Sequence, residues 1–138
     1  MAGFQFIDHT ADIGIAAWGK DLKEAFAEAA YGMFSVIADL EGVTEGESRQ
    51  VEVQAPDQEA LLVEWLNELL YLFDVEHILF KRFHIQELEE GRLTARVYGE
   101  VVDPRRHNLK TGVKAATYHL VKVEREGHRY RVQVILDI

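Results

Sequence analysis

Apolar and polar residues alternate near the N-terminus with the period of two that is typical of a β-strand. In residues 12–17, apolar side chains at every second position alternate with Asp12 and two small residues, so one face is expected in the core and Asp12 begins the other. Just upstream, Asp8, His9 and Thr10 come too densely for this period, which predicts a bend that turns polar groups toward a common point. The same residues also fit an ordinary turn in which they hydrogen-bond their own backbone.

Two longer segments carry apolar residues at the three- and four-residue spacing of an amphipathic helix. The first spans about residues 22–38, and Asp21 with Glu24 resembles a capping box at its start. Pro56 and Asp57 open the second helix, which spans about residues 58–74 and has a wide face rich in leucine and aromatic residues. Both apolar faces predict helices that pack into the core.

The other periodic segments predict strands, and two of the connections between them form hairpins. The expected strands after the first helix are residues 50–54, 78–88, 93–99, 113–124 and 129–138. Two segments lack periodicity: 40–48, an acidic surface loop, and 101–112, a basic loop long enough to be functional. The order strand, helix, strand, helix, then four strands predicts one α+β domain over residues 1–138, with a mixed or antiparallel sheet and two helices.

Composition narrows the possible functions. The 24 acidic against 15 basic residues give a formal net charge of −9, which opposes direct binding to nucleic acid and suits a cation or a basic protein partner. The absence of cysteine excludes disulfides and thiolate metal sites, so a metal would be bound by oxygen or imidazole. No apolar run approaches the roughly 18 to 20 residues of a membrane span, and a signal-peptide pattern is missing, so a cytoplasmic protein is expected.

Several common active-site patterns are missing from the sequence. The histidines form no close pair at helical spacing, and neither Ser35 nor Ser48 has the glycine flanks of a nucleophile elbow. No glycine-rich phosphate loop is present. The remaining candidates are polar residues at expected strand ends: Asp8, His9, Asp12, Glu100, Asp103, His107, Lys114, His119 and Asp137.

Asp137 follows an apolar strand and lies beside the α-carboxylate of Ile138. If Asp12 lies on a neighbouring strand, these groups would place several oxygens together, as hard cations such as calcium and magnesium require. The alternative is a frayed terminal strand with a solvated Asp137.

Four short motifs occur in this order along the chain: DHTADIG near the N-terminus, GE with DPRRH, VKAATYH, and a terminal VILDI. Together they resemble the archease family, whose members assist the RNA ligase that joins tRNA exon halves. The resemblance runs over essentially the whole chain and implies a single domain of strand-helix-strand-strand type. It also implies a protein that is not an enzyme, but accelerates guanylylation of a GTP-dependent ligase and lets the ligase turn over repeatedly.

The resemblance further implies that Asp12, Asp137 and Ile138 bind a divalent cation, expected to be calcium, with magnesium or manganese as alternatives. Four more residues are implied on the functional surface that meets the tRNA-splicing RNA ligase: Lys114, Asp8, His9 and Glu100. Neither strong direct nucleic-acid binding nor membrane association is expected. Two other functions remain open, a metal-dependent phosphoester hydrolase that uses the same carboxylates, and a chaperone or assembly protein for RNA-processing enzymes.

Overall fold

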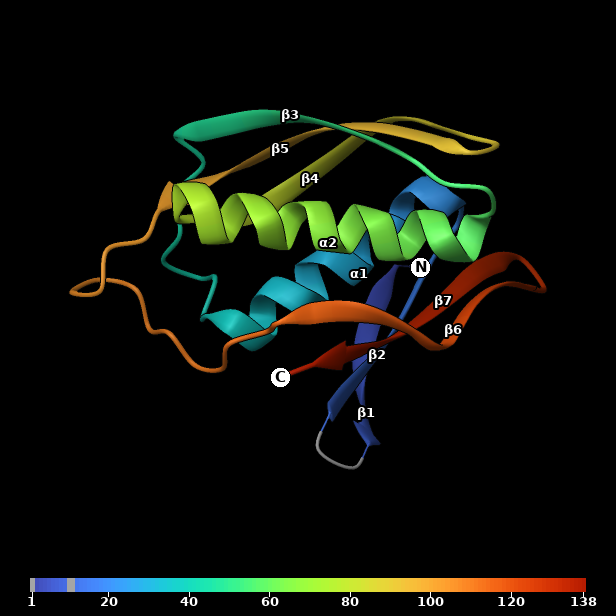
Figure 1. Cartoon of the computed structure of the whole chain (residues 1–138), viewed down its shortest axis with the longest axis horizontal. Coiled ribbons are helices and arrows are strands. Elements are labelled where there is room, and N and C mark those ends of the chain that lie inside the picture. The colour runs from blue at the N-terminus through green and yellow to red at the C-terminus, as the bar shows by residue number, and fades with distance from the viewer. Residues whose placement is uncertain (1, 10–11) are drawn as a thin grey trace.

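The structure, a computed structural model, describes residues 2–9 and 12–138, with only the backbone of Asp8 and His9 included. Within this part of the chain there are two helices and seven strands (Figure 1). Their order is β1 Gly3–His9, β2 Asp12–Gly19, α1 Leu22–Ile37, β3 Glu47–Gln54, α2 Gln58–Glu76, β4 Ile78–Glu89, β5 Arg92–Val101, β6 Ala115–Glu126 and β7 Arg129–Asp137. The predicted α+β class is confirmed.

The strands form two antiparallel sheets rather than one. One sheet has four strands in the order β1-β2-β7-β6, and the other has three in the order β3-β5-β4. The two helices lie between the sheets (Figure 1), with α1 in contact with β2 and β4, and α2 with β6 and β3. The core therefore has helices in the middle layer and a sheet on either side. Neither helix of the described residues is long and apolar enough to cross a membrane.

The N-terminal segment differs from the expectation of a single strand with a bend. It forms two strands, β1 and β2, which pair antiparallel in a register that brings His9 opposite Asp12. The dense polar residues thus mark a reversal of the chain between two strands, and Thr10 lies outside the described residues. Sequence periodicity missed β1 because Phe4 and Phe6 form only a short alternation before the polar cluster.

Both helices begin where the sequence predicts. Asp21 caps α1 by accepting a hydrogen bond from the Glu24 N–H at 2.8 Å, and Asp57 caps α2 in the same way through Ala60 at 2.8 Å. The apolar face of α2 is buried, and the Trp65 indole N–H donates to the Phe26 carbonyl at 3.0 Å, which ties the two helices together. Capping depends on residues close together in the chain, so the starts of both helices could be predicted from the sequence.

The long loop between β5 and β6 has a fixed position against the end of α1. The N–H groups of Lys110 and Thr111 donate to the carbonyls of Ile37 at 2.8 Å and Val36 at 3.2 Å, and the Asp39 N–H donates to Asn108 at 3.0 Å. The bonds from Lys110 and Thr111 satisfy carbonyls that the last turn of a helix leaves without an internal partner. The loop therefore carries its residues from the three-stranded sheet to the four-stranded sheet along a defined path (Figure 1).

Candidate functional site

Asp12 and Asp137 lie directly opposite each other on neighbouring strands. In the antiparallel register of β2 and β7, Asp12 pairs with Asp137 and the next pair is Ile13 with Leu136. Leu136 is fully buried and Ile13 packs against the core. Because side chains alternate between the faces of a sheet, the two aspartates share the opposite face, which the helices do not cover. We call Asp12 and Asp137 the carboxylate pair.

Two other predicted residues lie at the same end of this sheet. The Lys114 N–H donates to the Asp137 carbonyl at 2.7 Å, just before Ala115 pairs with Asp137 in the register of β6 and β7. The Lys114 side chain is exposed. Ile138 packs its side chain against the core, so the backbone that follows Asp137 is held in place. The sheet thus brings Asp12, Lys114, Asp137 and Ile138 together.

Glu100 lies elsewhere in the fold, near the end of β5 in the three-stranded sheet. Its carboxylate accepts hydrogen bonds from the Thr44 N–H at 3.0 Å and from His107 Nε2 at 2.9 Å, and it forms an ion pair with Arg106. The Thr44 bond first, then those from His107 and Arg106, lower the pKa of Glu100 to about 2. Thr44, His107 and Arg106 all belong to the loops around this sheet, so the carboxylate orders those loops.

His107 has a tautomer fixed by its neighbours. Its Nδ1 accepts a hydrogen bond from the Asp103 N–H at 2.8 Å, so the proton of the neutral ring is on Nε2 and is donated to Glu100. The ring is only 1% exposed. His107 therefore acts as a buried bridge between the start of the long loop and β5.

The side chains of Asp8 and His9 lie outside the described residues, so their expected place on the functional surface stays a prediction. Among the side chains that are described, no group of three or more histidine, aspartate or glutamate residues is arranged to hold a metal ion. The carboxylate pair supplies two side chains, and further ligands would come from the α-carboxylate of Ile138, backbone oxygens or water.

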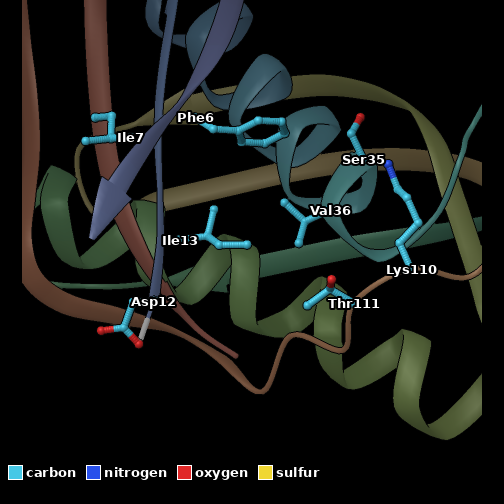
Figure 2. A pocket seen from close by; sticks show the side chains of 8 residues that line it. All are labelled: Phe6, Ile7, Asp12, Ile13, Ser35, Val36, Lys110 and Thr111. Atoms are coloured by element: carbon cyan, nitrogen blue, oxygen red, sulfur yellow. The ribbon is translucent and has the colours of Figure 1, made fainter. Parts of the chain in front are cut away.

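A pocket of about 340 Å³ opens next to the carboxylate pair (Figure 2). Its lining residues are Phe6, Ile7, Asp12, Ile13, Ser35, Val36, Lys110 and Thr111. Figure 2 shows Asp12 at one side of the pocket, Ser35 and Lys110 at the opposite side, and Ile13 and Val36 between them. An apolar centre with polar groups at its rim is typical of a binding site.

Comparison with known proteins identifies the family. The sequence profile of the Archease protein family matches residues 4–138. The chain belongs to the archease family. An archease of Sulfurisphaera tokodaii is 41% identical, and one of Pyrococcus abyssi is 42% identical; each match covers the whole of both chains.

Solved structures of similar proteins have the same fold. The solution structure of Methanobacterium thermoautotrophicum protein 1598 is 40% identical, covers 99% of each chain and superposes with a TM-score of 0.84. A crystal structure from Thermotoga maritima, described as an archease and possible chaperone, is 24% identical and covers 96% of this chain and 94% of its own, with a TM-score of 0.64. The second comparison supports the archease fold alone.

The position of the carboxylate pair in this archease structure suits a hard cation. Two carboxylates directly opposite each other in an antiparallel sheet repel, and their Cβ atoms are only about 5 Å apart in such a pair. A divalent cation between or beside them would offset this repulsion and find the oxygen ligands that calcium and magnesium prefer. The donor set therefore suits these metals and contains no thiolate that would favour a softer one.

Sequence reasoning missed two groups that line this pocket. Lys110 lies in the loop that was expected to be functional, but nothing in the sequence distinguishes it from its basic neighbours. Ser35 lies on the apolar helix α1 at its exposed edge, where its hydroxyl donates to the Tyr31 carbonyl at 2.8 Å. Only the contact between the end of α1 and the loop brings them to one pocket.

Proposed function

We propose that this chain is a non-enzymatic activator of the GTP-dependent tRNA-splicing RNA ligase, which binds a divalent cation and promotes guanylylation and multiple turnover of the ligase. Membership of the archease family supports the proposal. The single observation that carries it is the register that brings Asp12 opposite Asp137, because these are the residues implied as cation ligands by the family resemblance. Residues 125 positions apart in the sequence meet only through this register.

In the proposed site, Asp12, Asp137 and the α-carboxylate of Ile138 hold the cation, which is calcium or, alternatively, magnesium or manganese. When bound, the cation supplies a concentrated positive charge on an otherwise acidic protein. Lys114 is held beside Asp137 by its own backbone N–H, so its exposed ammonium group is available to the ligase. Asp8 and His9 are further candidates for that surface, whereas Glu100 would contribute by ordering the loop that leads to Lys114.

The test is a ligation assay under two conditions, one with the ligase in excess over RNA and the other with RNA in excess over the ligase. Each condition is measured in the presence and in the absence of this protein. Wild type should accelerate guanylylation and convert single turnover into multiple turnover. Asp137→Asn should lower this stimulation at least about tenfold, because it removes one charged ligand while keeping the shape of the side chain. Asp74→Asn on α2 makes the same charge change in another layer of the fold and should stimulate like wild type.

The outcomes separate the possible functions. If Asp137→Asn stimulates fully, the carboxylate pair is not the site, and a chaperone-like role without the cation is favoured. If the isolated wild-type protein hydrolyses phosphoesters with added metal, the hydrolase interpretation replaces the activator. If wild type has no effect on the ligase under either condition, the proposal is wrong.

A further inference from the structure

The pocket beside Asp12 continues into a second one along the end of α1. The second pocket, of about 480 Å³, is lined by Tyr31, Ser35, Ala38, Asp39, Leu40, Glu41, Lys81 and Lys110. Ser35 and Lys110 belong to both pockets, so the two are compartments of one groove, which we call the α1 groove. Its first compartment is that of Figure 2.

The first compartment has Phe6, Ile7, Ile13 and Val36 in its lining, and the β1–β2 hairpin that carries Phe6 projects away from the helices (Figure 1). Phe6 pairs with Ile15, which is fully buried, yet Phe6 itself is 53% exposed. The Phe6 ring packs in a T-shaped arrangement with the Phe4 ring, at a centroid distance of 5.6 Å. An aromatic ring on the core-facing side of a strand thus lacks cover, and an added apolar side chain would remove it from water.

The second compartment is lined by side chains of both charges. Lys81 is already occupied, because its ammonium group donates to the carbonyls of Glu41 at 3.3 Å and Val43 at 3.0 Å. Asp39 and Glu41 line the same compartment and are exposed, and among the described residues the Glu41 carboxylate has no hydrogen bond or ion pair. The compartment therefore has two carboxylates and two lysines in its lining, and the unpaired Glu41 carboxylate is the group available to a basic side chain.

Lys110 lies at the junction between the two compartments. Its backbone is fixed by the bond to Ile37, but within the described part of the chain its ammonium group makes no hydrogen bond or ion pair. An unpaired donor between the two compartments fits a carbonyl oxygen of an extended backbone. Alternate side chains of such a backbone, two positions apart, point the same way and would enter the two compartments.

We propose that the α1 groove binds an extended segment of a partner protein in which an apolar side chain is followed closely by an arginine or lysine. The apolar side chain packs on Phe6 and Val36 in the first compartment. The basic side chain pairs with Asp39 and Glu41 in the second, and Lys110 donates to the backbone between them. The net charge of −9 attracts such a segment from a distance.

The test uses isotope-labelled wild-type protein and a blocked hexapeptide of alanine with leucine and arginine two positions apart near its centre. We expect saturable changes in the backbone amide shifts of residues 35–41 and 110–111 at millimolar peptide. A matched peptide with glutamate in place of arginine should bind at least fivefold more weakly, and one with serine in place of leucine should also bind more weakly. The titration contains neither ligase nor cation, so its result stands apart from that of the ligase assay.

Two pairs of variants locate the binding. Phe6→Ser should weaken binding of the leucine–arginine peptide at least fivefold. Tyr71→Ser, at a similarly exposed aromatic residue on α2, should leave binding unchanged. Glu41→Lys should reverse the preference between arginine and glutamate peptides, whereas Glu124→Lys, an exposed residue of β6, should leave it unchanged. Thermal unfolding of each variant checks that the fold is kept.

The proposal is overturned if no groove amides shift with the leucine–arginine peptide, or if the changes lie on another surface. It is also overturned if the glutamate peptide binds equally well or better, since this would assign Lys110 as the recognition group for an acidic ligand. Binding that is equal in wild type and in both groove variants would have the same consequence.

Discussion

At the scale of single residues, the carboxylate pair places two negative charges close together at the proposed cation site. Like charges directly opposite each other in a sheet destabilise the fold, and Asp12 and Asp137 occupy such positions. Under the proposed function, a bound cation would offset this repulsion and add stability. Stability is therefore a readout of the cation that does not depend on the ligase.

Calcium should raise the melting temperature of the wild-type protein, because a ligand that binds only the folded state stabilises it. At one hundred times Kd the gain is about 2.7 kcal/mol. Asp137→Asn should have the higher melting temperature without calcium, since the repulsion is removed, and should gain little from calcium. Calorimetry with and without calcium checks both effects, with Asp74→Asn as the control. Equal calcium shifts in wild type and Asp137→Asn would contradict the assignment.

Glu100 makes folding stability depend on pH in the acidic range. Its pKa is lowered to about 2 in the folded protein by the Thr44 N–H, His107 and Arg106, whereas an unfolded glutamate titrates near 4.5. The lowered pKa adds stability above pH 4.5, and this is lost as the pH falls toward 2. Above pH 4.5 the contribution is complete.

Glu100→Gln should lower the melting temperature by a few degrees at pH 7, because an uncharged amide interacts less well with Arg106. The difference from wild type should shrink as the pH is lowered from 4.5 to 2, since protonation removes the same charge in wild type. Thermal unfolding of both proteins between pH 2 and 7 measures this. A difference that stays constant over the whole range would show that the charge of Glu100 is unimportant.

At the scale of elements, the loop over residues 101–112 connects the two sheets. One end is fixed by Glu100 and His107, and the other by the pairing of residues 108–111 with the end of α1. The loop then leads directly to Lys114 and to β6, which lies next to β7. Its conformation therefore determines where Lys110 and Lys114 lie relative to the carboxylate pair.

His107→Ala should loosen this loop. It deletes a buried ring with two hydrogen bonds, at a cost of about 2 to 4 kcal/mol. Amide exchange at Lys110 and Thr111 should accelerate more than exchange in β2 and β7. Hydrogen-exchange mass spectrometry and denaturant unfolding measure the two effects, with His128→Ala in the exposed turn before β7 as the control. Unchanged exchange at 110–111 would mean that the pairing with α1 holds the loop without His107.

At the scale of the whole molecule, the net charge and the order of the layers both bear on how a partner protein would associate. The chain carries a net charge of −9, and the two sheets enclose the helices, so the groups proposed to bind a partner are on sheet ends and loops. Acidic surfaces accelerate association with basic partners, and salt screens this effect.

The association rate with the ligase should therefore fall at least about tenfold between 50 mM and 500 mM salt, while dissociation changes less. Stopped-flow or surface-plasmon measurements at several salt concentrations test this expectation. A calcium-loaded and a calcium-free sample should be compared, because the bound cation alters the local charge. An association rate that is independent of salt would exclude electrostatic steering toward a basic partner.

Local features of the sequence determined the helices and the class of the fold. Asp21 and Asp57 predicted where α1 and α2 begin, and the helical stripes predicted their buried faces, because caps and periodicity act between residues close in the chain. The final hairpins were predicted for the same reason. Charge and the lack of cysteine limited the chemistry of any metal to oxygen or imidazole ligands.

Tertiary structure alone decided which distant groups meet. It divided the strands into two sheets, added β1 beside β2, and set the register that places Asp12 opposite Asp137. It also put Glu100 in the other sheet and brought Lys110 to the end of α1. Strand pairing joins residues far apart in sequence through backbone hydrogen bonds common to all residue types, so no local pattern specifies the partner or the register.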